Sequence, residues 1–143
     1  MFKGKKVLVL GLAKSGKAAV ELLKFMHADI TINESKKKED IPEYDTYVSE
    51  GIEMVCGGQP DELFERDFDF VVKNPGINYH APFILRLKER GIPVYTEIEL
   101  GYKVAKKQHY IAVTGTNGKT TTVTLIYEIL KAAGRKAHIC GNY

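Results

Sequence analysis

The chain has 143 residues, of which 44% are apolar and 27% are charged, with 21 lysines and arginines against 18 aspartates and glutamates. A globular chain of this length buries about 68–70% of its unfolded surface, so it needs neither disulfides nor a metal to hold a core. The net charge of +3, with both signs mixed along the sequence, excludes the strongly basic face of a typical nucleic-acid-binding domain.

Membrane and secretion signals are missing from the sequence as well. No apolar run approaches the ~18 residues that a membrane span requires, and the N-terminal lysines precede a strand-like run rather than the apolar core of a signal peptide. The two cysteines, Cys56 and Cys140, are too few for a disulfide scaffold and indicate free thiols in a reducing compartment. We therefore expect a cytoplasmic monomer that binds neither nucleic acid nor membrane.

Strand-like and helix-like patterns alternate through residues 1–107. Apolar, β-branched runs predict strands at residues 6–10, 28–33, 51–56, 68–72 and 92–95. Helical spacing or helix-start signals follow near Ser15, Pro60, Pro82 and Thr96, with Gly91 as a C-cap. Such alternation is typical of parallel strands joined by right-handed crossovers, so this part is predicted to be an open, doubly wound, Rossmann-like α/β sheet.

A second unit is predicted at residues 108–143, after a polar, basic stretch. It consists of a strand at 110–113, a glycine loop at 114–120, a helix at 121–133 closed by Gly134, and a strand at 136–140. This is the first βαβ of a P-loop domain, and it is too short to bury its own sheet. The expectation is that the second domain is truncated.

The first glycine loop, residues 11–16, follows the first strand and opens the first helix. Backbone amides at a helix N-terminus bind anions there, and glycine allows a close approach. The loop departs from the dinucleotide fingerprint GxGxxG because Ala13 replaces the second glycine, and the second strand ends in Asn33 and Glu34 rather than in a clear ribose-binding acid. This loop alone leaves a ligand-free turn and an NAD or FAD site both open.

The second glycine loop carries a sharper pattern, Gly115-Thr116-Asn117-Gly118-Lys119-Thr120. Its amides can cradle phosphate oxygens, Lys119 can place its ammonium between the outer phosphates, and Thr120 can give its hydroxyl to Mg²⁺. The strict GxxxxGK[ST] motif would have glycine at Val113, so this loop is a variant of it. The pattern predicts phosphate binding.

Several motifs taken together resemble the Mur ligase family. They are the two glycine loops, Asn74-Pro75-Gly76-Ile77 after the fourth strand, Glu97-Ile98-Glu99-Leu100, and Gly141-Asn142 after the last one. The resemblance covers the whole chain and implies a three-domain, ATP-dependent amide ligase of peptidoglycan precursor synthesis. Within the family it is strongest to the members that add D-glutamate to UDP-N-acetylmuramoyl-L-alanine.

The resemblance implies a reaction through an acyl phosphate. ATP activates the substrate carboxylate, and the amine of D-glutamate attacks to give the amide, ADP and phosphate. Lys119 and Thr120 would be the catalytic residues, with Thr120 as a ligand of Mg²⁺. The ATP phosphates would be held by Gly115, Thr116, Asn117, Gly118, Lys119, Thr120 and Thr121.

By the same resemblance, the first domain would bind the UDP moiety at the carboxyl ends of its strands. The residues implied are Leu12, Ala13, Lys14, Ser15 and Gly16 in the first loop, Asn33, Glu34 and Ser35 after the second strand, Asn74, Pro75 and Gly76 after the fourth, and Asn142. The D-glutamate site, the adenine pocket and the remaining metal ligands would lie beyond Tyr143, so this stretch alone would be inactive.

Two other interpretations remain open. A non-catalytic Rossmann-type module that senses a nucleotide or binds NAD would not require the Lys119-Thr120 pair. A folate- or cyanophycin-type amide ligase would share that pair but lack the glycine turn near the N-terminus.

Overall fold

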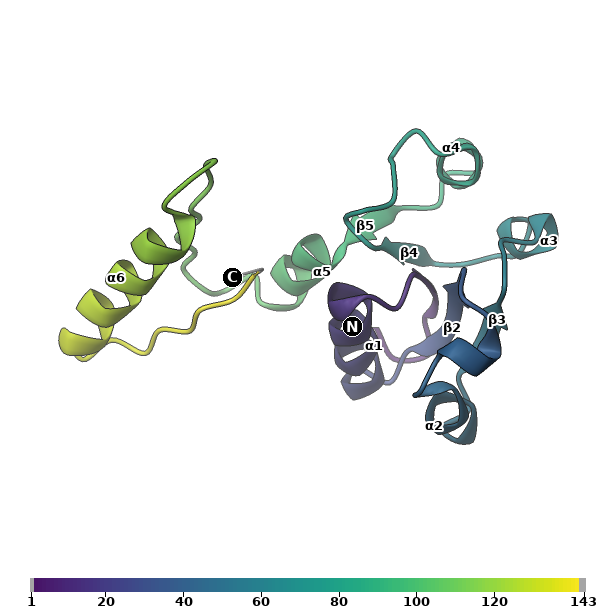
Figure 1. Cartoon of the computed structure of the whole chain (residues 1–143), viewed down its shortest axis with the longest axis horizontal. Coiled ribbons are helices and arrows are strands. Elements are labelled where there is room, and N and C mark those ends of the chain that lie inside the picture. The colour runs from purple at the N-terminus through teal and green to yellow at the C-terminus, as the bar shows by residue number, and fades with distance from the viewer. Residues whose placement is uncertain (1, 142–143) are drawn as a thin grey trace. The chain divides into compact units, whose positions relative to one another are not determined.

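A computed structural model describes residues 2–141 of the chain. The chain divides into two compact units, Met1–Val104 and Ala105–Tyr143, which are described separately (Figure 1). The predicted boundary after residue 107 lies close to this division.

The first unit is built on a five-stranded sheet in the order β3-β2-β1-β4-β5. Its strands are β1 (Lys6–Leu10), β2 (Asp29–Glu34), β3 (Glu53–Cys56), β4 (Phe70–Lys73) and β5 (Val94–Thr96). Every pairing is parallel, with Leu10 of β1 in register with Asn33 of β2 and Lys73 of β4. The predicted parallel α/β sheet is confirmed.

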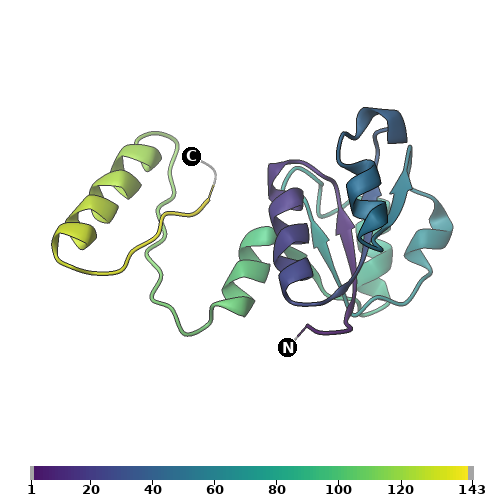
Figure 2. The ribbon, with the colours of Figure 1, turned by 90° about the horizontal axis from the view of Figure 1, so that it is seen from below.

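Helices cover both faces of the sheet. They are α1 (Lys14–Phe25), α2 (Tyr44–Ser49), α3 (Asp61–Phe64), α4 (Pro82–Glu89) and α5 (Glu97–Val104), with a short 3-10 turn at Lys38–Asp40. Figures 1 and 2 show α1 and α2 on one side of the sheet and α3 and α4 on the other. This arrangement confirms the doubly wound topology.

The alternation of side chains along β1 explains why both faces need cover. Val7 and Val9 pack into the cluster beneath α1, α2 and α5, whereas Leu8 and Leu10 pack into the cluster beneath α3 and α4. All four are fully buried, as expected for a central parallel strand. Burial of each such side chain contributes roughly 1.5–3 kcal/mol, so β1 anchors the fold from which the loops extend.

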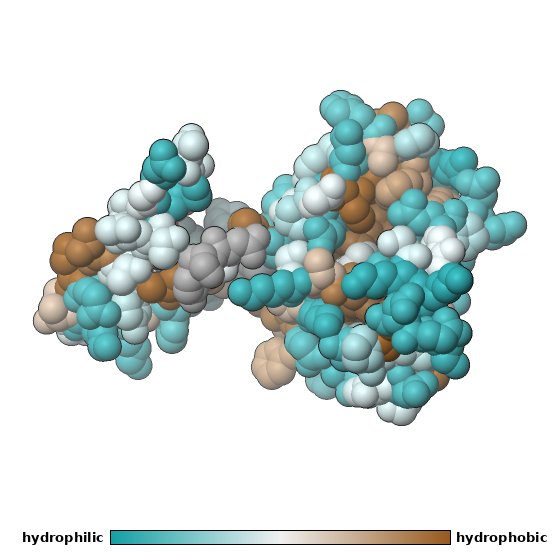
Figure 3. All heavy atoms as spheres, viewed as in Figure 1, coloured by the Kyte–Doolittle hydropathy of each residue, from teal (hydrophilic) through white to brown (hydrophobic). Residues whose placement is uncertain are grey.

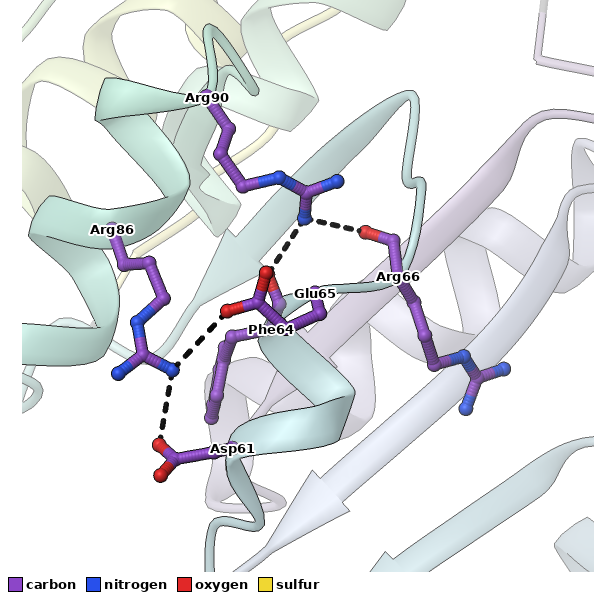
Figure 4. Close-up of polar contacts among 6 residues, drawn as sticks. All are labelled: Asp61, Phe64, Glu65, Arg66, Arg86 and Arg90. Atoms are coloured by element: carbon purple, nitrogen blue, oxygen red, sulfur yellow. Dashed lines mark hydrogen bonds and ion pairs between the residues drawn. The ribbon is translucent and has the colours of Figure 1, made fainter.

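Arg86 of α4 and Arg90, which directly follows α4, hold the short helix α3 in place, as Figure 4 shows. Arg90 donates to the backbone carbonyls of Phe64 at 2.6 Å and Arg66 at 2.9 Å, which satisfies acceptors at the end of α3. Arg86 forms ion pairs with Asp61 at 3.0 Å and Glu65 at 3.5 Å. A helix of four residues cannot be stable alone, so these contacts account for its position.

Two local signals have different outcomes. Thr96 caps α5 as predicted, because its hydroxyl accepts from the Glu99 amide at 3.4 Å while the Glu99 carboxylate accepts from the Thr96 amide at 2.7 Å. Helix α2, in contrast, was not predicted. Tyr47 is its only buried residue, so it has no apolar period that a sequence reading could detect.

Within residues 105–141 the second unit contains one helix, α6 (Lys119–Ala132), which confirms the predicted helix and begins two residues earlier than expected. The predicted strands at 110–113 and 136–140 are wrong for the described residues, since neither segment is paired in a ladder. A strand requires a hydrogen-bonding neighbour, and this unit offers none. The βαβ arrangement of a P-loop domain is therefore not formed here.

No side chain of α6 is buried, and Leu125 and Ile129 are 59% and 67% exposed. Figure 3 shows hydrophobic residues on the visible surface of this helix. Gly134 follows the helix with φ +71°, the left-handed conformation expected of a C-terminal cap. Over residues 2–141, no helix is both long and apolar enough to cross a lipid bilayer.

Candidate functional site

Three loops meet at the carboxyl edge of the sheet in the first unit. The strand order reverses between β1 and β4, which is where open α/β sheets bind ligands. The Gly11 amide donates to the Asn33 carbonyl at 2.9 Å, and the Asn74 amide donates to the Leu10 carbonyl at 3.0 Å. The structure thus brings together the predicted residues of the first glycine loop with those that follow β2 and β4.

The first glycine loop is a close turn that requires two of its glycines. Gly11 has φ +87°, and a side chain on it would press within 3.3 Å of the Asn74 Cβ. A Cβ on Gly16 would overlap the carbonyl oxygen of Gly11. The loop therefore lies directly against the first turn of α1.

The first turn of α1 is available to an anion. Ala13 is the N-cap and provides no side-chain hydrogen bond, so the amides that begin the helix have no intrahelical acceptor. Lys14 is exposed and Ser15 is half-buried at this turn, whereas Leu12 is buried. Free amides, a lysine and a hydroxyl form a donor set that matches a diphosphate.

Glu34 supports this loop from β2. Its carboxylate accepts from the Leu12 amide at 2.6 Å, from the Ser35 hydroxyl at 3.1 Å and from the Lys36 amide at 3.1 Å. Burial pushes the pKa of the Glu34 carboxyl upward, but the hydrogen bonds outweigh burial and hold this pKa below the ordinary glutamate value. Glu34 is therefore an anion that fixes the loop.

The Asn33 side chain is also buried and hydrogen-bonded within the protein. It is 2% exposed, and its amide nitrogen donates to the carbonyls of Val55 at 3.0 Å and Gly58 at 2.7 Å. Ser35, in contrast, is exposed. Direct ligand contact by Asn33 or Glu34 stays a prediction, while the structure gives both side chains a supporting role.

The variant Glu34→Gln tests the support of the loop. At neutral pH we expect the free energy of unfolding to fall by about 1–3 kcal/mol. The reason is that the side-chain NH₂ of glutamine then faces the Lys36 amide or the Ser35 hydroxyl, where the wild type has a charged acceptor. The lowered folded-state pKa means that the wild-type contribution is full above the unfolded-state pKa and is lost as the pH falls through the folded-state value.

Melting curves at neutral and acidic pH measure this effect. The difference in melting temperature between wild type and Glu34→Gln shrinks as the pH falls. A difference that is independent of pH would contradict an ionised Glu34.

The segment after β4 forms a tight turn. The Asn74 side-chain oxygen accepts from the Gly76 amide at 2.9 Å, and the Asn74 carbonyl accepts from the Ile77 amide at 3.0 Å. Pro75 and Gly76 are exposed at its tip. Beneath the turn lies Lys73, a residue that the sequence analysis did not single out.

A small hollow of about 40 Å³ lies beside the first loop. Leu12, Lys17, Glu34, Lys36, Asp40, Ile41, Pro42 and Glu43 line it. Lys36 opens the basic run Lys36-Lys37-Lys38, and its place beside this hollow is a second feature that the sequence analysis does not assign to the site. No pattern in the sequence distinguishes it from Lys37 and Lys38.

A larger hollow of about 410 Å³ lies at the opposite edge of the sheet, and it is a poor phosphate site. Asp29, Glu53, Glu65 and Asp67 line it, against Lys6 and Arg66. Arg66 is already paired with Glu53 through bonds of 3.0 and 2.6 Å. This acidic lining repels phosphates, so we place the candidate site at the carboxyl edge despite its smaller volume.

In the second unit, the lysine loop precedes α6 as predicted. Gly118 is the N-cap with φ +74°, and Lys119 donates its ammonium to the carbonyls of Gly115 and Thr116. Thr120 and Thr121 are exposed in the first turn, where the helical amides have no intrahelical acceptor. Asn117 is exposed, and Asn142 lies outside the described residues.

These residues fit the phosphates of a nucleotide better than they fit a metal on their own. The loop offers amides, an ammonium and hydroxyls, all of which are donors to phosphate oxygens. The Thr120 hydroxyl can supply one ligand to Mg²⁺. Among residues 2–141, no group of three or more His, Cys, Asp or Glu side chains is placed to hold a metal.

Family comparisons agree with both units. Residues 5–96 match the Mur ligase MurD-like N-terminal domain, and residues 113–143 match the Mur ligase middle domain. UDP-N-acetylmuramoylalanine–D-glutamate ligase of Streptococcus agalactiae serotype Ia is 48% identical over 141 residues, which cover 99% of this chain and 31% of that protein. The enzyme of the same name from Streptococcus pneumoniae strain Hungary19A-6 is 49% identical over the same coverage.

Solved structures show the same fold. A murein peptide ligase from Psychrobacter arcticus has a TM-score of 0.62 at 22% identity, covering 92% of this chain and 27% of its own. A pseudomurein peptide ligase type C from Methanothermus fervidus has a TM-score of 0.59 at 28% identity, with the same coverage. The chain spans about 31% of the length of the curated relatives it matches.

Proposed function

Because the chain belongs to the Mur ligase family, with a MurD-like N-terminal domain at residues 5–96, we propose that it carries part of an ATP-dependent ligase that adds D-glutamate to UDP-N-acetylmuramoyl-L-alanine. The near 50% identity to D-glutamate ligases over almost the whole chain supports this step. The observation that carries the proposal is the meeting of three loops at the carboxyl edge of the sheet.

Under this proposal, residues 1–107 bind the UDP moiety. The amides of residues 13–16, with Lys14 and Ser15, face the diphosphate, because they form the anion-binding start of α1, while the Leu12 amide is held by the Glu34 carboxylate. The turn at Asn74, Pro75 and Gly76 lines the uracil, and Ser35 faces the nucleoside from the end of β2. Glu34 and Asn33 hold these groups in place.

Residues 108–143 begin the ATP-binding domain. Gly115, Thr116, Asn117, Gly118 and Thr121 cradle the phosphates while Lys119 neutralises the transferred group, and Thr120 provides a ligand for Mg²⁺. Bound Mg²⁺ would supply further positive charge at the phosphates. The work of these residues is charge stabilisation, which is the main requirement of phosphoryl transfer to a carboxylate.

Titration of the 143-residue chain with UDP-N-acetylmuramoyl-L-alanine, UDP, NAD and ATP tests the proposal. We expect weak but detectable binding of the two uridine compounds, with shifts at the amides of residues 12–16 and 74–76 in NMR spectra. We expect no ATP hydrolysis and no response to NAD. We also expect a monomer in solution, in keeping with a cytoplasmic enzyme.

Other outcomes would favour other functions. Shifts with NAD alone would overturn the ligase in favour of a Rossmann-type sensing module. Tight ATP binding without a uridine response would reverse the roles given to the two units.

A further inference from the structure

A buried lysine lies under the turn that follows β4. Lys73 is 2% exposed and is the only buried lysine or arginine among residues 2–141. It lies two residues after Val71 and so shares the sheet face that α3 and α4 cover. A cation in this position must be offset by specific partners, since burial of an unpaired charge is costly.

Its partners are the two ends of the turn. The Lys73 ammonium donates to the Ile77 carbonyl at 2.8 Å and to the Asn74 carbonyl at 3.3 Å. The nitrogen also lies 4.0 Å from the ring centroid of Tyr79. The Asn74 carbonyl belongs to the segment that the proposed function assigns to uracil, and the Ile77 carbonyl lies directly after it, so one side chain joins the start of that segment to the residue that follows it.

Charges on neighbouring elements bear on the ammonium. Burial lowers the pKa of Lys73, the carboxylates of Glu97 and Glu99 at the start of α5 oppose this, and Lys88 on α4 adds to the lowering. The acidic start of α5 thus favours the charged form of Lys73. Charged donors make stronger hydrogen bonds to carbonyls than neutral ones.

We propose that Lys73 is a positioning residue for nucleotide binding, which holds the turn of Asn74, Pro75 and Gly76 in the shape that receives the base. The inference rests on the proposed function of the first unit. Lys73 does not touch the ligand, because it is buried beneath the turn; it acts through the two carbonyls it binds. Stability alone does not require a lysine here, since replacing a buried charge with an apolar side chain of similar size is often neutral for folding.

The test compares Lys73→Met with Lys88→Met in the 143-residue chain. Lys88 is a matched control because its ammonium lies 4.7 Å from the centroid of the same Tyr79 ring, but it is exposed and forms no hydrogen bond with the turn in the described part of the chain. Calorimetric titration with UDP should give an affinity about ten- to a hundredfold weaker for Lys73→Met, the equivalent of one charge-assisted hydrogen bond. Lys88→Met should bind UDP as the wild type does.

Two further readouts separate positioning from general stability. Without ligand, exchange of the Ile77 amide proton, which is bonded to the Asn74 carbonyl, should be faster in Lys73→Met and unchanged in Lys88→Met. In the full-length ligase, KM for the uridine substrate should rise by about the same factor as the loss of UDP affinity. KM for ATP should not change.

Failure of the two proposals can be told apart. If the wild-type chain does not bind UDP, the proposed function is wrong and the inference falls with it. If the wild type binds UDP and Lys73→Met binds it within twofold, only the inference is wrong. Should Lys73→Met not fold, Lys73→Gln, which keeps an amide donor but not the charge, is titrated instead and judged by the same outcomes.

Discussion

The variant Gly16→Ala loses both stability and UDP binding. A methyl group at this position would overlap the carbonyl oxygen of Gly11 and lie 3.0 Å from its carbonyl carbon, so backbone rather than a flexible side chain must move. Such overpacking costs roughly 1–3 kcal/mol, a substantial part of the roughly 5–15 kcal/mol that stabilises a typical domain. Because the displaced backbone is the proposed diphosphate loop, we expect UDP affinity to fall at least tenfold as well.

Gly101→Ala is the matched control. Gly101 also lies in a helix of the first unit, but no atom lies within 4 Å of its added Cβ. Alanine is the better helix former by about 0.5–1 kcal/mol, so this variant should be slightly more stable than the wild type. Chemical denaturation and UDP titration of both variants measure the effects. Unchanged stability and unchanged affinity in Gly16→Ala would mean that the turn neither packs closely nor binds the nucleotide.

Local pattern predicted much of the first unit. In β1, a run of buried aliphatic residues ends at Gly11, and the helical period begins directly afterwards; each signal depends only on neighbouring residues. The requirement for glycine at position 16 was also readable, since a helix that starts against a strand leaves little room. The loops that meet at the switch point follow from the parallel topology once the strand order is known.

The partners of buried polar side chains were not predictable. The family resemblance implied Glu34 as a contact of the UDP moiety, but its carboxylate accepts from the amide of Leu12, which is distant in sequence. Lys73 lies just beyond the strand predicted at 68–72, whereas β4 includes it and the alternation of side chains places it with Val71 on a buried face. In both cases the deciding contact lies between separate elements, and neither composition nor periodicity reports such contacts.

The second unit shows the limit of strand prediction. Tyr110 and Ile111 have the aromatic and aliphatic character of a strand, but they are 49% and 63% exposed and belong to no β-ladder of the described residues. The strand preference of a side chain describes how well it packs on the surface of a sheet. It does not provide the neighbouring strands that a sheet requires. A helix needs no neighbouring element, because its backbone hydrogen bonds are internal, and α6 therefore forms as predicted.

The largest functional effect is expected for Lys119→Ala in the full-length ligase. The Lys119 ammonium bonds to the carbonyls of Gly115 and Thr116, which are neutral acceptors that an anionic phosphate can displace. Loss of this charge removes stabilisation where negative charge develops during transfer, so kcat should fall about 10²–10³-fold.

The proposal assigns the uridine substrate to the first unit and ATP to the second, and this assignment determines the controls for that experiment. Affinity for UDP-N-acetylmuramoyl-L-alanine, which the first unit is proposed to bind, should remain within twofold in Lys119→Ala. Lys131→Ala removes the same charge from the last turn of α6, away from the loop, and should retain near wild-type kcat. Steady-state kinetics and calorimetry on both variants provide the comparison. A parallel loss of uridine-substrate affinity in Lys119→Ala would contradict the assignment of ATP to the lysine loop and of UDP to the carboxyl edge of the sheet.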